Sequence, residues 1–300
     1  IVLASPRGFC AGVVRAIDIV NMCIKKFGTP VYVRHEIVHN PHVVTELKKK
    51  GAIFVDELSE IPPNSTVIFS AHGVAPKVWD EARQKQLHII DATCPLVTKV
   101  HSESIKYKKQ GYSIILVGHE GHDEVIGTMG EAPEQTHLIE SENQVENLKV
   151  QHPDKTIALT QTTLSVEDTK NVIDSLKRKF PNLIARNDIC YATSNRQEAV
   201  KQLASQVDMV LVIGATNSSN CARLQEVAAN CGIPSYLING PESVQEEWLN
   251  SYKKIGLTSG ASTPEQLITA VITKCNPEKV TTLEVKKEDV SFVLPKALRD

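Results

Sequence analysis

The sequence predicts an α/β protein made of three similar units with mainly parallel sheets. Short β-branched runs alternate with helical patterns along most of the 300 residues. Three cysteines also recur at regular distances, each after a strand-like run and before a helical pattern. Strands that alternate with helices form parallel sheets covered by helices, so these two observations indicate a repeated α/β unit.

The individual elements follow from local patterns. The run AGVVRAIDIVNMCIKKFG places apolar residues at helical spacing and ends at Gly28, and NPHVVTELKKKG offers Asn40 as N-cap and Pro41 as the first helical residue. The runs LSVEDTKNVIDSLKRKF and SSNCARLQEVAANCG have the same helical character. Strands are predicted at PVYV, TVIFS, LHIID, YSIILVG, KTIALT, MVLVIG and KIGLTS.

The spacing of Cys10, Cys94 and Cys190, 84 and 96 residues apart, predicts the unit boundaries. We expect α/β units over residues 11–95, 96–190 and 191–280, followed by a C-terminal tail over 281–300. The third unit lacks a last strand, and the N-terminal strand within 1–10 is expected to complete it. A pseudo-threefold arrangement of the units would bring the three cysteines to one point.

Composition excludes several classes of protein. The formal net charge of −2 argues against a nucleic-acid partner, which requires a basic face. No apolar run has the length of about 18 residues that a membrane span needs, and no secretory signal is visible. Seven cysteines without tight local spacing argue against a disulfide framework, so we expect a reducing compartment and a cytoplasmic protein.

Three of the cysteines are candidate metal ligands. Cys10, Cys94 and Cys190 follow predicted strands, where open α/β sheets place their ligands. Three thiolates without a fourth indicate either a zinc site or an iron–sulfur cluster with one iron left open. Cys23, Cys231 and Cys275 are expected to be core residues. Cys221 is either a core residue or a thiol near the metal.

Small polar loops follow six of the predicted strands and suggest an anion site. They lie at Val38–Pro41, Ser70–Gly73, Gly118–Glu124, Thr160–Thr163, Thr216–Asn220 and Ser259–Thr263, with almost no Lys or Arg. Backbone N–H groups, hydroxyls and histidines can hold a phosphate there. The string HEIVH resembles a zinc-protease motif, but Asn40–Pro41 begins a helix after it, so we reject that interpretation.

The same residues carry a family resemblance. The segments PRGFCAGV, VYVRHEIVHNPHVV, FSAHGV, DATCPLVTKVH, GHEGHDEVIGTMG, TQTTLS, DICYATSNRQ and NSSN resemble the 4-hydroxy-3-methylbut-2-enyl diphosphate reductase (IspH/LytB) family, in order, from Ser5 to about Ser262. The resemblance implies three α/β domains around a central iron–sulfur cluster. It implies an oxidoreductase of isoprene biosynthesis that turns (E)-4-hydroxy-3-methylbut-2-enyl diphosphate into isopentenyl and dimethylallyl diphosphates by two-electron reductive dehydroxylation, the last step of the non-mevalonate pathway.

The resemblance also implies roles for residues. It makes Cys10, Cys94 and Cys190 the ligands of a 4Fe–4S cluster with one iron not held by a protein cysteine. It makes Glu124 the proton donor and Thr162 the residue that orients the substrate hydroxyl. The diphosphate ligands that it implies, besides Thr162, are His39, His72, His122, Ser218, Ser219, Asn220 and Ser262.

The spacing of residues offers a separate reason to expect Glu124, and not Glu120, to be the proton donor. In an extended loop, residues i and i+2 point the same way, so His122 and Glu124 would both face the ligand.

Two other function classes stay open. A non-redox hydro-lyase could use an open-iron cluster as a Lewis acid on a phosphorylated substrate, and it would turn over without a reductant. A phosphosugar-binding module could carry these cysteines as core residues, and it would be colourless. The chain has no convincing dinucleotide fingerprint. For the reductase we therefore expect electrons from a protein donor of the ferredoxin or flavodoxin type.

Overall fold

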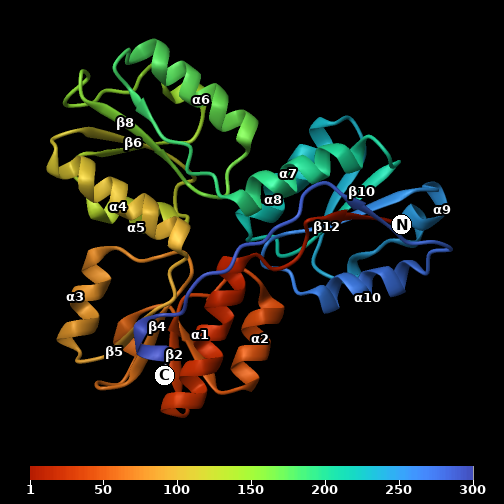
Figure 1. Cartoon of the computed structure of the whole chain (residues 1–300), viewed down its shortest axis with the longest axis horizontal. Coiled ribbons are helices and arrows are strands. Elements are labelled where there is room, and N and C mark those ends of the chain that lie inside the picture. Colours follow the sequence, from red (N-terminus) through yellow and green to blue (C-terminus); the bar gives the residue numbers. More distant parts are fainter. Residues whose placement is uncertain (300) are drawn as a thin grey trace. The chain divides into compact units, whose positions relative to one another are not determined.

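The computed structural model describes residues 1–299, in which helices and strands alternate (Figure 1). Parallel pairing joins the neighbouring strands of all three sheets, as the sequence predicts. Helices α1 (Ala11–Phe27) and α2 (Pro41–Lys49) follow the first and second strands. Within the described residues, no helix is both long enough and apolar enough to cross a membrane.

One four-stranded sheet has the order β3-β2-β4-β5. Its strands are β2 (Val31–Arg34), β3 (Ala52–Val55), β4 (Thr66–Phe69) and β5 (His88–Asp91), and helix α3 is Pro76–Gln84. Phe69 is completely buried and meets Trp79 of α3 edge to face, with 5.0 Å between the ring centroids. This aromatic pair anchors α3 against the sheet.

A second four-stranded sheet has the order β7-β6-β8-β9. Its strands are β6 (Ser113–Val117), β7 (Thr136–Ile139), β8 (Thr156–Thr160) and β9 (Ile184–Ala185). Helices α4 (Pro95–Lys109) and α5 (Asp123–Glu131) bury Val100 and Val125 in one apolar cluster, and α6 (Val166–Lys179) buries Val172 in another. Helices thus cover both faces, which explains the continuous apolar runs of β6 and β8.

The third sheet has five strands in the order β11-β10-β12-β1-β13, so the N-terminal strand lies between two C-terminal ones (Figure 1). Its strands are β1 (Val2–Ser5), β10 (Met209–Ile213), β11 (Ser235–Ile238), β12 (Ile255–Ser259) and β13 (Thr281–Glu284). Helices α7 (Tyr191–Ala204) and α8 (Ser219–Asn230) supply one apolar cluster. Helices α9 (Glu246–Ser251) and α10 (Glu265–Cys275) supply the other.

The chain divides into two compact units. The sheet-A unit holds the five-stranded sheet and consists of Ile1–Val14, His39–Thr45 and Cys190–Ser291. The sheet-BC unit holds both four-stranded sheets and consists of Arg15–Val38, Glu46–Ile189 and the chain from Phe292 onward. The boundaries expected for three units, after residues 95, 190 and 280, stay a prediction. Residues 281–284, within the expected tail, form β13.

Two glycines end neighbouring strands of the sheet-A unit against a cysteine. Gly214 follows β10 and Gly260 follows β12, and a Cβ at either position would overlap the Sγ of Cys221 from α8. Cys221 is completely buried, and this burial raises the pKa of its thiol. Cys221 is therefore a core residue, and its fit between the glycines sets how closely α8 approaches the strand ends.

We expect Gly260→Ala to destabilise the protein by about 1–3 kcal/mol, because the new methyl group overpacks the Cys221 site. Adding Cys221→Ala removes the sulfur, after which the nearest neighbours of that methyl group are Oδ1 of Asn220 at 3.5 Å and Cβ of residue 221 at 3.6 Å. The double variant should thus melt at a higher temperature than Gly260→Ala alone, as measured by circular dichroism. Cys231→Ala, at an exposed thiol, is the matched control and should give no rescue. Equal melting temperatures for Gly260→Ala and the Cys221→Ala double variant would contradict this packing.

Candidate functional site

Each of the three predicted ligand cysteines stands at a helix N-terminus. Cys94 is the N-cap of α4 and Cys190 is the N-cap of α7. Cys10 directly precedes α1, and its carbonyl accepts the N–H of Val14 at 3.0 Å. All three thiols are partly exposed. Because a helix N-terminus stabilises negative charge, a metal-bound thiolate would fit at each of these three places.

The other cysteines have a different environment. Burial raises the pKa of Cys23 to about 12 and also raises the pKa of Cys275. Cys23 and Cys221 are fully buried. All seven cysteines are free thiols. Cys231 is exposed, so the expectation that it is a core residue is wrong. What distinguishes Cys10, Cys94 and Cys190 from the other four cysteines is that each directly precedes a helix.

Hydrogen bonds hold the Cys94 loop in the sheet-BC unit. The N–H of Cys94 donates to the carbonyl of Ala71 at 2.9 Å. Asp91 accepts both the N–H and the hydroxyl of Thr93, at 2.9 and 2.5 Å. Arg15 donates to the carbonyl of Thr93 at 3.0 Å. The loop that presents the thiol is therefore fixed from three sides.

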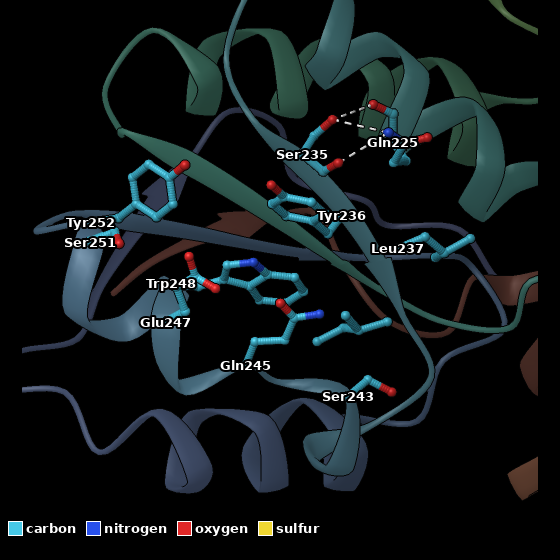
Figure 2. A pocket seen from close by; sticks show the side chains of 11 residues that line it. Gln225, Ser235, Tyr236, Leu237, Ser243, Gln245, Glu247, Trp248, Ser251 and Tyr252 are labelled. Carbon is cyan, nitrogen blue, oxygen red and sulfur yellow. Dashed lines mark hydrogen bonds between the residues drawn. The ribbon is translucent and has the colours of Figure 1, made fainter.

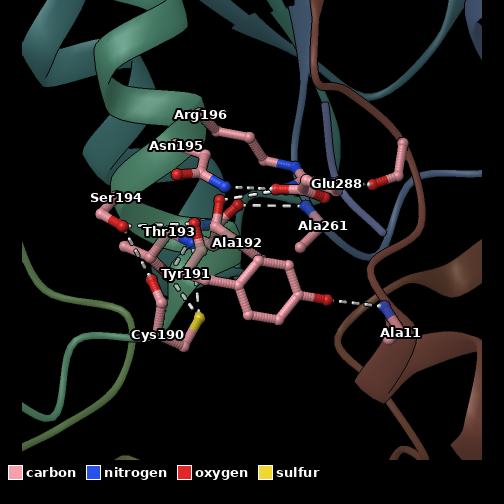
Figure 3. A network of polar contacts seen from close by, with 12 residues as sticks. Ala11, Cys190, Tyr191, Ala192, Thr193, Ser194, Asn195, Arg196, Ala261 and Glu288 are labelled. Atoms are coloured by element: carbon pink, nitrogen blue, oxygen red, sulfur yellow. Dashed lines mark hydrogen bonds and ion pairs between the residues drawn. The ribbon is translucent and has the colours of Figure 1, made fainter. Parts of the chain in front are cut away.

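In the sheet-A unit, the loops of Cys10 and Cys190 are bound to each other (Figure 3). The N–H of Ala11 donates to the hydroxyl of Tyr191 at 3.2 Å, so the residues that follow the two cysteines meet. Burial raises the pKa of Tyr191 to about 12, so its hydroxyl stays protonated at neutral pH. The N–H of Cys10 donates to the carbonyl of Ala261 at 3.1 Å.

A buried ion pair braces the same two loops. Arg196 on α7 is completely buried and donates to Gly8, two residues before Cys10, at 2.8 Å. Its Nη1 contacts Glu288 at 2.9 Å, and Asn195 also donates to Glu288 (Figure 3). Sequence analysis missed Glu288, which lies in the segment expected to be a tail. No local pattern could have shown that it meets a residue 92 positions away.

A histidine cluster lies in the sheet-BC unit. The rings of His72, which follows β4, and His122, the N-cap of α5, meet edge to face at 6.0 Å. Asp123 contacts Nδ1 of His35 at 2.9 Å and Nδ1 of His72 at 3.7 Å. Sequence reasoning missed Asp123 and His35. In the structure, the backbone distinguishes His35, because its φ of 57° is unusual for a residue other than glycine. The sequence gives no sign of this conformation.

The HEIVH string has no helix through it. His35 and His39 follow β2, and α2 begins at Pro41, which confirms the rejection of the zinc-protease motif.

The tautomer of His122 follows from its cap. Its Nδ1 accepts the N–H of Glu124 at 3.2 Å, so the ring proton lies on Nε2. The extended-loop argument for His122 and Glu124 is wrong, because Glu124 already lies in the first turn of α5. The two residues are instead joined through the helix cap.

Glu124 and Thr162 form a buried pair in the sheet-BC unit. Glu124 is 6% exposed and Thr162, after β8, is 4% exposed. The backbone N–H of Thr162 donates to Oε2 of Glu124 at 2.9 Å, and the hydroxyl donates to Oε1 at 2.9 Å. Glu120 differs, because it is exposed and its N–H donates to Glu140. The structure therefore places a carboxyl group against a hydroxyl group with water largely excluded.

The remaining predicted ligands lie in the sheet-A unit near the N-terminus of α8. Ser218 is its N-cap, Ser219 and Asn220 form its first turn, and Asn220 accepts the N–H of Ala261 at 3.0 Å. The hydroxyl of Ser262 donates to the carbonyl of His39 at 3.0 Å. A helix N-terminus with hydroxyl and amide groups suits an anion.

The predicted site residues divide between the units. Cys94, His72, His122, Glu124 and Thr162 belong to the sheet-BC unit, whereas the sheet-A unit contributes Cys10, Cys190, His39, Ser218, Ser219, Asn220 and Ser262. The convergence of all twelve on one point stays a prediction.

A separate pocket of about 680 Å³ opens along β11 and α9, where Tyr236 stacks on Trp248 with 4.3 Å between ring centroids (Figure 2). Gln225 closes one end by donating to Ser235 at 3.1 Å. None of the predicted ligands, all of which lie within residues 1–299, lines this pocket.

Comparison with known proteins identifies the family. The model of the LytB protein family matches residues 1–276. The chain is 53% identical to the 4-hydroxy-3-methylbut-2-enyl diphosphate reductase of Saccharophagus degradans, over 99% of this chain and 98% of the relative. It is 51% identical to the reductase of the same name from Pseudomonas aeruginosa, over the same shares of both chains.

Solved structures agree with these relatives. The E-1-hydroxy-2-methyl-but-2-enyl-4-diphosphate reductase of Plasmodium falciparum matches with a TM-score of 0.96 and 40% identity, over 99% of this chain and 96% of that one. A structure described as (E)-4-hydroxy-3-methyl-but-2-enyl diphosphate reductase, the terminal enzyme of the non-mevalonate pathway, matches with a TM-score of 0.66 and 36% identity, over 92% and 98% of the chains. A family model that spans most of the chain and relatives more than half identical over its length lead to one conclusion: the chain belongs to the LytB protein family.

Proposed function

We propose that this protein reduces (E)-4-hydroxy-3-methylbut-2-enyl diphosphate to isopentenyl and dimethylallyl diphosphates, as the last step of the non-mevalonate isoprenoid pathway. Two electrons and two protons enter, and the allylic hydroxyl group leaves as water. The single observation that carries the proposal is the contrast among the cysteines, of which Cys10, Cys94 and Cys190 alone directly precede a helix. The names of the close relatives support the substrate and the reaction.

The cysteines fit an iron–sulfur cluster. Three thiols at helix N-termini, each half-exposed and held by backbone hydrogen bonds, match what a thiolate-ligated cluster requires. Cys10, Cys94 and Cys190 would hold a 4Fe–4S cluster with one iron free of protein cysteine. Such a cluster supplies electrons and a Lewis-acidic iron for the substrate hydroxyl group.

Neutral donors would hold the diphosphate. Ser218, Ser219 and Asn220 lie where the first N–H groups of α8 have no carbonyl partner within their own helix, which favours an anion. His122 offers an Nε2–H donor because the cap occupies its Nδ1. His39, His72 and Ser262 complete the proposed set.

Glu124 would be the proton donor. Thr162 already donates to both oxygens of this buried carboxyl group, at 2.9 and 3.0 Å. A hydroxyl oxygen also accepts hydrogen bonds, so Thr162 can hold the substrate hydroxyl group next to Glu124. The pair would then deliver a proton to the leaving oxygen and, after reduction, to carbon.

The electrons would come from a ferredoxin- or flavodoxin-type protein, because the sequence has no convincing dinucleotide fingerprint. Seven cysteines without tight local spacing support a reducing, cytoplasmic location.

The test is turnover of the allylic diphosphate by anaerobically purified protein, with and without a reductant. Product that forms only with reductant supports the reductase. Loss of water from the substrate without a reductant would support the hydro-lyase, and colourless, iron-free protein would support a binding module.

The first prediction of this proposal concerns the ligands. Replacing Cys10, Cys94 or Cys190 by Ser should each remove the brown colour, most of the iron and the activity, because a serine oxygen is a poor ligand for a cluster. Iron assays and visible spectra of anaerobic samples measure this. Cys231→Ser and Cys275→Ser are the matched controls and should keep full iron. A Cys94→Ser variant with a complete cluster would refute the assignment.

The second prediction concerns Glu124. Glu124→Gln keeps the shape and removes the transferable proton, so turnover should fall by about 10²–10⁴-fold. Substrate should still bind and change the cluster spectrum. The control is Glu120→Gln, an exposed residue of the same loop, which should be nearly silent. Retention of more than about half of the wild-type turnover by Glu124→Gln would assign the proton to another group.

The third prediction concerns oxygen. An iron without a protein thiolate should be lost first in air, which leaves a three-iron cluster. Bound inorganic diphosphate should slow that loss, because a ligand stabilises the state that it binds. Electron paramagnetic resonance on aerated samples follows the change. Unchanged iron content and no three-iron signal after hours in air would argue against an open iron.

A further inference from the structure

A continuous chain of hydrogen bonds joins the Cys10 loop to the sulfur of Cys190 inside the sheet-A unit, and Figure 3 labels Ala261, Thr193 and Cys190 along it. The N–H of Cys10 donates to the carbonyl of Ala261, and the N–H of Ala261 donates to Oδ1 of Asn220 at 3.0 Å. Nδ2 of Asn220 contacts Oγ1 of Thr193 at 3.3 Å, and this oxygen lies 3.2 Å from Sγ of Cys190. Thr193 is only 1% exposed, so water does not compete for these contacts.

The direction of each bond in this chain follows from its donors. A backbone N–H can only donate, so the atom of Asn220 that faces Ala261 is the oxygen. The other end of the amide is therefore the NH₂ group, which donates to Thr193. Because the Thr193 oxygen accepts at that point, its own proton is available for Cys190. A metal-bound thiolate can only accept, so the hydroxyl group donates to the sulfur.

Thr193 provides a second hydrogen-bond donor to the sulfur of Cys190. The backbone N–H of Thr193 lies 3.3 Å from Sγ of Cys190, as part of the N-cap of α7. Hydrogen bonds to the sulfurs of an iron–sulfur cluster lower the cost of adding an electron, because they offset negative charge. Two donors from one buried residue are thus aimed at one ligand atom.

We propose that Thr193 is a positioning residue, whose hydroxyl group donates to the Cys190 thiolate and raises the reduction potential of the cluster held there. This inference rests on the proposed function, since it needs a cluster at Cys190. Asn220, a proposed diphosphate ligand, would then have a second role, because its NH₂ group orients the hydroxyl group of Thr193. A ligand that binds the amide of Asn220 would then change the electrostatic environment of the sulfur.

Thr193→Val and Thr193→Ser separate this role from simple packing. Valine keeps the size and the backbone N–H but loses the hydroxyl group, whereas serine keeps the hydroxyl group and loses a methyl group. Thr258→Val is the matched control in the same unit, because the buried Thr258 hydroxyl has no hydrogen-bond partner among residues 1–299. The holoenzymes are compared anaerobically for iron content and for midpoint potential in a redox titration followed by electron paramagnetic resonance.

We expect Thr193→Val to keep its iron, to have a more negative midpoint potential and to turn over about 10-fold or more slowly, the usual effect of losing a partner of a metal ligand. Thr193→Ser and Thr258→Val should resemble the wild type in potential. A Thr193→Val cluster with the wild-type potential would overturn the inference while leaving the reductase intact. Wild-type protein without a cluster would overturn the proposed function and this inference together.

A second measurement decides the case in which Thr193→Val does not retain iron. The half-life of iron loss in air is then compared for Thr193→Ser and the wild type. Equal half-lives support the hydroxyl group as the important feature. Rapid loss in Thr193→Ser would show that the methyl group, and therefore packing, matters, and would overturn the inference.

Discussion

The parallel pairing of β1 with β12 and β13 is the interaction on which the sheet-A unit depends. Val2 is in register with Gly256 on one side and Thr281 on the other, so the first strand joins segments from the end of the chain. This pairing brings Gly8 to Ser259, which accepts its N–H at 2.8 Å. The same pairing sets the Cys10 loop beside the segments that carry Cys190, Asn220 and Ser262, and the loop contacts these segments through Tyr191 and Ala261.

Helix N-termini then set the chemistry of both units. Thiols, hydroxyls, an imidazole and a carboxyl group stand at the starts of α4, α5, α7 and α8, because short loops lead from strand ends directly into these helices. The partial positive charge there favours thiolates and bound anions without any lysine. Buried polar groups such as Glu124 and Arg196 are paired, which offsets the cost of removing them from water.

Local patterns predicted the elements well and their tertiary partners poorly. The helix at Pro41 and the parallel sheets follow from caps and β-branched runs. The sequence patterns did not identify Thr193 or Glu288. Their contacts with the side chains of Cys190 and Arg196 form only in the folded protein. The parity argument for Glu124 failed because α5 begins one residue earlier, at Asp123. The hydrophobic periodicity of a segment predicts which of its residues are buried. It does not predict which distant residue will be the hydrogen-bond partner of a given side chain.

The position of β1 has a consequence for biosynthesis. A ribosome makes the Cys10 loop first, but its partners Arg196 and Ser259 lie 188 and 251 residues from Gly8 in the sequence. At a typical elongation rate of about 5–20 residues per second, roughly 10–50 s pass before these partners exist. During that time the first strand has no sheet to join, and the thiol is carried on an unfolded segment. A metal site that needs Cys10 together with Cys190 would therefore form only after this sheet has folded.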